Sequence, residues 1–302
     1  MVGTAIRTEA LTKYYGAARG IVGVDLEVEV GEVFGFLGPN GAGKTTTIRL
    51  LVDHIRPTSG RAQVLGLDPQ REPVEVLRRV GLLPTDMELY PRLTGRALLD
   101  YLGNVRGGRH ASVRDGLVER FGAELDRPVR ALSRGNRQKL ALVAAFMHDP
   151  ELVILDEPTT GLDPLVQQEF QTLVRELRDR GRTAFLSSHT LSEVERVADR
   201  VGIIRAGELV VTERVEELKA KAVRHLEFEF PEPVAPAAFA ALPGVRTAET
   251  DHAGRVLRLA IEGPVGPAVM LAAQHEPINV ISAEPDLEEL FLAYYHRDGR
   301  AG

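Results

Sequence analysis

A glycine-rich segment carries the most specific chemistry in the sequence. It runs from Gly38 to Thr45 as Gly-Pro-Asn-Gly-Ala-Gly-Lys-Thr and fits the pattern G-x-x-x-x-G-K-[ST]. Glycines allow successive backbone N–H groups to turn inward around a phosphate, in conformations that a Cβ would obstruct. Lys44 would supply positive charge to the β and γ phosphates of a nucleotide, and the Thr45 hydroxyl would ligate Mg²⁺. The predicted nucleotide-binding residues here are Gly38, Pro39, Asn40, Gly41, Ala42, Gly43, Lys44, Thr45 and Thr46.

The flanking residues support this interpretation. The apolar run 33–37 is predicted to be a buried strand, and residues 44–52 are predicted to form a helix, whose N-terminus adds a partial positive charge. The alternative is an ordinary strand-to-helix turn, but at a glycine frequency of about 7% a chance match is on the order of 1%. The segment therefore predicts nucleotide binding.

Two adjacent carboxylates, Asp156 and Glu157, follow the apolar run 152–155. Ligands of parallel sheets bind at the carboxyl ends of the strands. Because successive side chains on a strand point to opposite faces, the two carboxylates are expected to have different roles. Asp156 would hold Mg²⁺ directly or through water, and Glu157 would orient or deprotonate an attacking water. Without a phosphate loop nearby, such a pair would more simply be a helix cap or a turn.

A histidine, His189, comes shortly after another strand-like run, residues 183–187. Its imidazole could form a hydrogen bond with a γ phosphate. The alternative is that His189 only caps a helix that begins near Thr190. The remaining histidines are scattered and the chain has no cysteine, so no zinc site is predicted.

These residues require a parallel sheet covered by helices. Short apolar runs alternate with longer amphipathic ones, which indicates βα units. Further strands are predicted at 80–83, 152–155 and 183–187, a hairpin at 203–211, and an inserted helical subdomain where the pattern between 94 and 121 has a period of 3.6. The fold class is α/β.

A second unit is predicted after Lys221. Leu226, Phe228 and Phe230 alternate with polar residues, as in a half-buried strand. Helices at 236–242 and 265–273 and strands at 245–250, 256–261 and 278–283 complete the order βαββαβ, a split βαβ arrangement. An apolar helix face follows, formed by Leu287, Leu290, Phe291 and Tyr294.

The composition excludes several classes of protein. The 302 residues carry a formal charge of −6, with 44% hydrophobic and 26% charged residues, which excludes disordered and collagen-like chains. The longest apolar run, 140–147, is well short of the roughly 20 residues that span a bilayer. The N-terminus lacks the apolar region of a secretory signal, so we expect a cytoplasmic protein. The mildly acidic net charge offers no attraction to nucleic acid, so we expect no nucleic-acid partner.

At this point the chain resembles the ATP-binding subunit of an ATP-binding cassette (ABC) transporter, over about residues 4 to 220. Residues 132–138, Leu-Ser-Arg-Gly-Asn-Arg-Gln, are similar to the family signature LSGGQ-x-Q, and residues 161–164, Gly-Leu-Asp-Pro, to the D-loop. The resemblance implies that Tyr15 stacks on adenine and that His189 is the switch histidine. It also implies two cassettes arranged head to tail, with Ser133 and Gly135 contacting the γ phosphate held by the other subunit's Lys44.

The implied architecture is a P-loop ATPase cassette with a mixed β core at 1–221, including a helical subdomain at about 85–150. The tail, 222–302, resembles the small α+β, ferredoxin-like domain of multidrug and antibiotic exporter cassettes. The alternative is a packing or dimerising domain without a ligand.

The chain departs from the family pattern at three positions. The signature has Arg134 and Asn136 where the family usually has Gly and Gln, but Ser133 and Gly135, the pair that would face the phosphate, are retained, so we expect activity to survive. Thr85 stands where the Q-loop glutamine is usual. Our hypothesis is that Thr85 or Asp86 reaches the metal or its water; the alternative is that this loop only contacts the membrane partner.

The function that these motifs imply is ATP hydrolysis, with Mg²⁺ as cofactor, by a homodimer of cassettes. This dimer would power a separately encoded membrane permease, as an exporter, from the cytoplasmic face of the membrane. The alternatives are a nucleotide-gated regulatory or resistance protein and a soluble cassette in translation or DNA maintenance. A P-loop kinase or GTPase is disfavoured, because neither needs the signature at 132–138.

Overall fold

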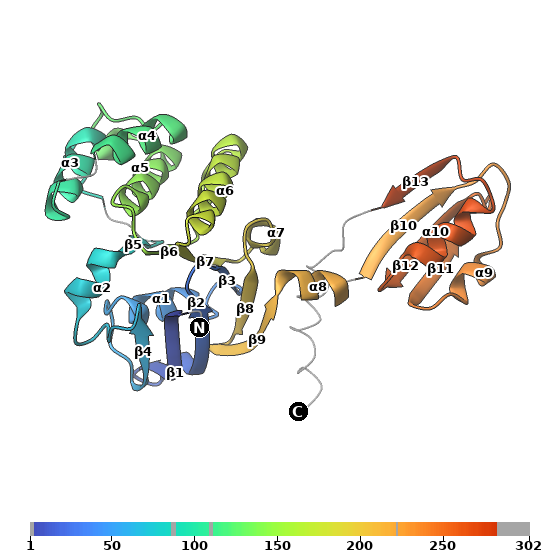
Figure 1. Ribbon diagram of the computed structural model, residues 1–302, viewed down its shortest axis with the longest axis horizontal. Coiled ribbons are helices and arrows are strands. Elements are labelled where there is room, and N and C mark those ends of the chain that lie inside the picture. Colours follow the sequence, from blue (N-terminus) through green and yellow to red (C-terminus); the bar gives the residue numbers. More distant parts are fainter. Residues whose placement is uncertain (1–2, 86–88, 109–110, 222, 283–302) are drawn as a thin grey trace. The chain divides into compact units, whose positions relative to one another are not determined.

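The computed structural model describes residues 3–85, 89–108, 111–221 and 223–282 (Figure 1). The chain divides into two compact units, Met1–Thr212 and Glu213–Gly302. The boundary predicted after residue 221 stays a prediction. Asp86 and the predicted apolar helix face 287–294 lie outside the described residues.

The larger sheet of the first unit has six strands in the order β5-β6-β7-β3-β8-β9. The four pairs from β5 to β8 are parallel, and every residue of β3, β6 and β7 is buried, as in parallel sheets that are covered on both faces. The strands predicted at 33–37, 80–83, 152–155 and 183–187 are confirmed. Their bounds are β3 Val33–Leu37, β5 Val80–Leu83, β6 Leu152–Asp156, β7 Thr183–Ser188, β8 Arg200–Arg205 and β9 Glu208–Arg214.

A second, antiparallel sheet has the order β2-β1-β4, with β1 Thr4–Tyr15, β2 Ala18–Glu29 and β4 Ser59–Val64. Sequence reasoning missed these strands. Residues 26–29 alternate between buried and exposed, but β1 has several register shifts against β2, and bulges of this kind break the alternation that marks a strand. Residues of both sheets and of helix α1 (Lys44–Leu51) share one hydrophobic cluster.

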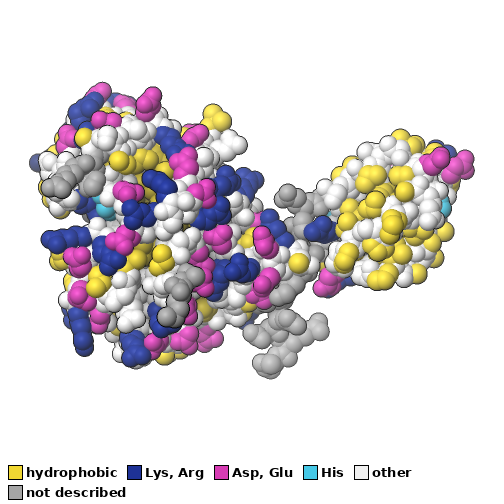
Figure 2. Space-filling model, in the orientation of Figure 1, with side chains coloured by type: hydrophobic (Ala, Val, Ile, Leu, Met, Phe, Trp, Pro, Cys, Tyr) yellow, Lys and Arg dark blue, Asp and Glu magenta, His cyan; other side chains and the backbone are white. Residues whose placement is uncertain are grey.

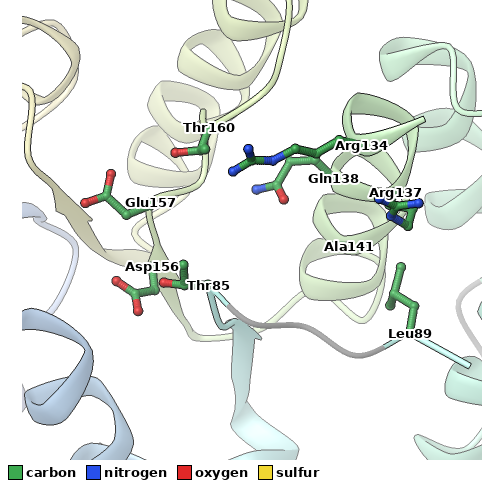
Figure 3. A pocket seen from close by; sticks show the side chains of 9 residues that line it. All are labelled: Thr85, Leu89, Arg134, Arg137, Gln138, Ala141, Asp156, Glu157 and Thr160. Atoms are coloured by element: carbon green, nitrogen blue, oxygen red, sulfur yellow. The ribbon is translucent and has the colours of Figure 1, made fainter. Parts of the chain in front are cut away.

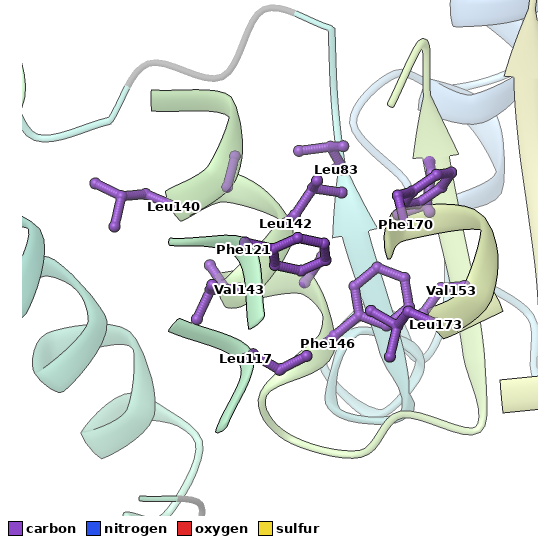
Figure 4. Packing of buried hydrophobic residues seen from close by; sticks show 14 of the residues in the cluster. Leu83, Leu117, Phe121, Leu140, Leu142, Val143, Phe146, Val153, Phe170 and Leu173 are labelled. Atoms are coloured by element: carbon purple, nitrogen blue, oxygen red, sulfur yellow. The ribbon is translucent and has the colours of Figure 1, made fainter. Parts of the chain in front are cut away.

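The helical insertion connects β5 to β6. It contains α3 (Gly95–Val105), α4 (Ala111–Phe121), the short 3₁₀ helix η1 (Val129–Ala131) and α5 (Arg134–Phe146). In a second hydrophobic cluster, Leu142 and Phe146 of α5 pack with Val153 of β6 and Phe170 of α6 (Pro164–Asp179) (Figure 4). The rings of Phe146 and Phe170 meet edge to face, with centroids 6.4 Å apart. This packing positions the N-terminus of α5 relative to the sheet. Two further helices are α2 (Pro73–Arg79) and α7 (Leu191–Glu195).

The second unit has a four-stranded sheet in the order β11-β12-β10-β13, in which all neighbouring strands are antiparallel. Leu226, Phe228 and Phe230 are buried in its core, as their alternation predicted. Figure 2 shows apolar side chains on the visible face of this unit; its exposed apolar residues include Val269 and Met270 of α10. The elements are α8 Val215–Lys221, β10 Val223–Glu229, α9 Pro236–Ala240, β11 Val245–Thr250, β12 Val256–Glu262, α10 Gly266–Ala273 and β13 Asn279–Ser282.

Among the described residues, no helix combines the length and the apolar character needed to cross a membrane.

Candidate functional site

The glycine-rich loop joins β3 to α1. At two positions of this loop the backbone has a conformation that favours glycine. Gly41 and Gly43 have φ angles of 81° and 114°, in the left-handed region. A Cβ on Gly43 would lie 2.6 Å from Cγ2 of Ile21, so this position has neither the conformation nor the space for a side chain. Gly43 is also the N-cap of α1, so the loop leads directly into the positive end of the helix.

Lys44 is folded back over this loop. Its side chain is 6% exposed, and its Nζ donates hydrogen bonds to the carbonyl oxygens of Gly38 (2.6 Å) and Pro39 (3.3 Å). The same Nζ lies 3.2 Å from Oε1 of Glu157, a charge contact that links the loop to the end of β6. A buried ammonium is costly without such partners, and this one lies where a bound phosphate would meet it.

Two of the three residues predicted to hold a metal, Thr45 and Asp156, meet at the carboxyl end of β6. Thr45 Oγ1 donates to Oδ2 of Asp156 at 2.7 Å, and Ser187 Oγ donates to Oδ1 of the same carboxylate. Asp156 is 1% exposed. A threonine hydroxyl and a carboxylate are hard oxygen donors, so the residues fit Mg²⁺. Sequence reasoning missed Ser187, whose only signal is its place at the end of the strand-like run 183–187.

Glu157 and His189 form a second pair beside this one. His189 Nδ1 lies 2.8 Å from Oε2 of Glu157, and Glu157 has a φ of 52°, unusual for a residue other than glycine. The backbone N–H of Glu157 donates to the carbonyl oxygen of Ser187 at 3.2 Å, which holds this conformation. The interpretation of His189 as a helix cap is wrong: the backbone N–H of Thr190 donates to Ser188 Oγ instead, at 3.0 Å.

A cavity of about 240 Å³ lies over the glycine-rich loop. Tyr15, Arg19 and Gly20 line one side of it, and Tyr15 is 46% exposed, so its ring is accessible for stacking. The other lining residues are Pro39, Asn40, Gly41, Gly43, Lys44, Thr45, Thr46, Thr85 and Glu157. The structure therefore brings Tyr15, most of the glycine-rich loop and Glu157 to one cavity. His189 does not line it and is connected to it through Glu157.

Thr85, just beyond β5, also lines a second cavity of about 140 Å³ (Figure 3). This second cavity lies between the end of β6 and the N-terminal part of α5. Its lining residues are Thr85, Leu89, Arg134, Arg137, Gln138, Ala141, Asp156, Glu157 and Thr160. Thr85 is thus near the predicted metal and water residues.

The signature residues are at the start of α5. Ser133 is the N-cap and its Oγ accepts a hydrogen bond from the backbone N–H of Asn136 at 3.1 Å. Gly135 is close to the D-loop: a Cβ there would lie 2.9 Å from the carbonyl oxygen of Gly161. Neither Ser133 nor Gly135 lines the cavity over the glycine-rich loop, so one chain does not bring them together with Lys44.

The fold and this site define a P-loop ATPase domain with a helical insertion that carries a signature sequence. The chain belongs to the ABC transporter family: the family model described as "ABC transporter" matches residues 21–160. Bacitracin transport ATP-binding protein BcrA of Bacillus licheniformis is 39% identical over 231 residues, 76% of this chain and 76% of that protein. Daunorubicin resistance ATP-binding protein DrrA3 of Streptomyces coeruleorubidus is 42% identical over 226 residues, covering 73% of this chain and 72% of that protein. The chain is accordingly an ATP-hydrolysing subunit of this family.

Solved structures share the fold. An ATP-binding subunit of an ABC transporter has a TM-score of 0.67 and 28% identity, over 72% of this chain and 92% of that one. The ATP-binding cassette MJ0796, solved as a dimer in a post-hydrolysis state bound to ADP and Pi, has a TM-score of 0.65 and 20% identity. That match covers 70% of this chain and 98% of the other, and it supports the mixed α/β cassette fold.

Proposed function

We propose that this chain powers an exporter by hydrolysing ATP at the interface of two identical cassettes, bound to a separate membrane permease at the cytoplasmic face. The observation that carries the proposal is the convergence of Lys44, His189 and Glu157, with the Thr45–Asp156 pair beside them. The two relatives are a bacitracin transport protein and a daunorubicin resistance protein, which supports export of antibiotic-like compounds.

The chemistry follows from the positions of these groups. Mg²⁺, when bound by Thr45 and Asp156, would spread the charge of the β and γ phosphates. Glu157 accepts a proton from the attacking water, whose oxygen bonds to the γ phosphorus as the bond to the β–γ bridging oxygen breaks. His189 holds the Glu157 carboxylate in orientation, and Lys44 stabilises negative charge on the phosphate oxygens. The products are ADP and phosphate.

The proposed dimer is supported by the separation of Ser133 and Gly135 from their own chain's phosphate loop. In a head-to-tail pair, the signature of each copy would complete the site of the other. The solved cassette MJ0796 is itself described as a dimer.

Two finer assignments belong to the same proposal. Thr85 contributes to the metal or water position in place of the usual glutamine, supported by its place in the walls of both cavities. Residues 222–302 form a ferredoxin-like domain, supported by the element order βαββαβ and the strand order β11-β12-β10-β13.

The test is the ATPase activity of the purified chain beside Glu157→Gln. We expect turnover to fall at least about 100-fold, because the amide cannot accept the proton from water. Glu119→Gln, on the exposed surface of α4, is the matched control and should leave turnover unchanged. Equal turnover in wild type and Glu157→Gln would refute the assignment of Glu157.

A further inference from the structure

Arg134 has an unusual position for a basic residue. It is the first residue of α5, directly after the N-cap Ser133, at the end of the helix where the backbone already contributes partial positive charge. Its side chain packs across the D-loop: a Cβ on Gly161 would lie 3.5 Å from Cγ, Cδ and Nε of Arg134. Figure 3 shows the guanidinium directed toward Thr160, in the second cavity.

The anions of this cavity are engaged by other groups. Thr45 and Ser187 both donate to Asp156, while Lys44 and His189 contact the two carboxylate oxygens of Glu157. Within the described ranges, Arg134 has neither an ion pair nor a hydrogen bond, whereas its neighbour Arg137 donates to the carbonyl oxygen of Leu132 at 2.8 Å. Arg134 is therefore an exposed cation in the wall of the cavity that Asp156 and Glu157 also line, and it has no anion of its own in the described part of the chain.

The other unusual signature residue, Asn136, differs from Arg134 in this respect. Its Oδ1 accepts a hydrogen bond from the backbone N–H of Glu124 at 3.0 Å, so it ties α5 to the segment that follows α4. Asn136 has a structural role within the chain. Arg134 has no comparable role, and a cation at a helix N-terminus disfavours the helix.

We infer that Arg134 binds the γ phosphate of the ATP molecule that is held by a second copy of the chain. This inference rests on the head-to-tail dimer proposed above. Arg134 lies between Ser133 and Gly135, the two residues assigned to that phosphate, and a guanidinium offers a planar set of donors that suits phosphate oxygens. The guanidinium charge thereby adds to the partial positive charge of the α5 N-terminus. It distinguishes ATP from ADP because ADP has no γ phosphate.

The experiment measures ATP-driven dimerisation by sedimentation in the Glu157→Gln background, with Mg-ATP and with Mg-ADP. Arg134→Gln removes the charge and keeps part of the stem that packs on Gly161. Arg134→Lys keeps a charge, and Arg130→Gln, on the exposed 3₁₀ turn before the signature, is the matched control. We expect Arg134→Gln to weaken the ATP-bound dimer about tenfold or more, the size of one charge-assisted hydrogen bond. Arg134→Lys should restore part of the loss, and Arg130→Gln should have no effect.

Affinity for ADP, measured on the single chain, separates this role from a folding defect. It should be the same in all variants, because the phosphate loop and Tyr15 belong to the same chain as the bound ADP. Equal dimerisation with and without Arg134, or a matching loss of ADP affinity, would overturn the inference while leaving the proposed dimer intact. Absence of dimerisation with Arg134 intact would overturn the proposed dimer, and the inference with it.

Discussion

The proposed site has two halves: the phosphate loop with the end of β6, and the signature at the start of α5. They differ in how many partners their side chains have within the same chain. Around the phosphate loop, Lys44, Asp156 and Glu157 all have partners within the chain, and each lies within 3.2 Å of at least one of them. At the signature, the Ser133 hydroxyl only caps its own helix, and Arg134 makes no ion pair in the described part of the chain. The difference teaches that the groups proposed to bind nucleotide are linked to one another within the chain, whereas the groups proposed to contact a second copy's phosphate are not.

The phosphate-loop half should be the more sensitive to mutation in the isolated chain. Lys44→Met keeps an unbranched side chain, one atom shorter, and removes the charge. We expect turnover to fall about 1,000-fold, the upper range for loss of one preorganised electrostatic contact. Steady-state ATPase assays on the folded variant measure this, with folding checked by circular dichroism. Near-normal turnover of Lys44→Met would contradict the role proposed for Lys44, stabilisation of negative charge on the phosphate oxygens.

The signature half should affect turnover without affecting the pocket of its own chain. Ser133→Asp retains an efficient N-cap for α5 but places negative charge opposite phosphate. Turnover should fall about 100-fold, while the affinity of the single chain for ADP stays unchanged. Ser133→Thr, which keeps both the cap and the hydroxyl, is the control. An equal loss of ADP affinity in Ser133→Asp would show that the signature also contributes to nucleotide binding in its own chain, which contradicts the proposed division into two halves.

Ser187 tests the support behind the metal residues. Ser187→Ala removes the hydrogen bond to Oδ1 of Asp156 and the one that Ser187 Oγ accepts from the backbone N–H of Glu157, which keeps its bond to the Ser187 carbonyl oxygen. We expect the Mg²⁺ concentration for half-maximal turnover to rise about tenfold, as for other groups that orient metal ligands. Ser188→Ala is the control, since Ser188 donates to Glu193 rather than to Asp156. Titration of Mg²⁺ at saturating ATP measures the effect. Identical titrations would show that Ser187 is not needed to orient the metal ligand.

Tyr15 tests the adenine side of the pocket. Tyr15→Ala should raise the KM for ATP about fivefold with little change in kcat, because stacking contributes equally to the bound substrate and the transition state. Tyr15→Phe keeps the ring and should behave like wild type. If Tyr15→Phe and Tyr15→Ala raise the KM for ATP equally, the Tyr15 hydroxyl rather than stacking of its ring accounts for ATP binding.

The smallest effect is expected at Thr85. Thr85→Ala should lower kcat about threefold, the size of one neutral hydrogen bond to the metal-bound or attacking water. The matching Asp86→Ala variant tests the other residue of the hypothesis. Unchanged turnover in both variants would favour the interpretation that this loop only contacts the membrane partner.

The sequence predicted the parallel strands and the position of the glycine-rich turn between β3 and α1, because buried strands and glycine-rich turns are local patterns. Residues 33–37 and Gly43 each carry their signal within a few positions. Three features depend on contacts between distant residues and could not be predicted in that way. The bulged strand β1 loses its alternation, Ser187 reaches Asp156 only through the pairing of β7 with β6, and the contact of Arg134 with Gly161 depends on packing between α5 and the D-loop.

The mass of Glu157→Gln in solution, with and without Mg-ATP, tests the central claim most directly. The account predicts a single chain without nucleotide or with ADP and twice that mass with ATP, because the γ phosphate joins the phosphate loop of one copy to the signature of the other. A mass that stays at one chain with ATP bound would contradict a site shared between two copies.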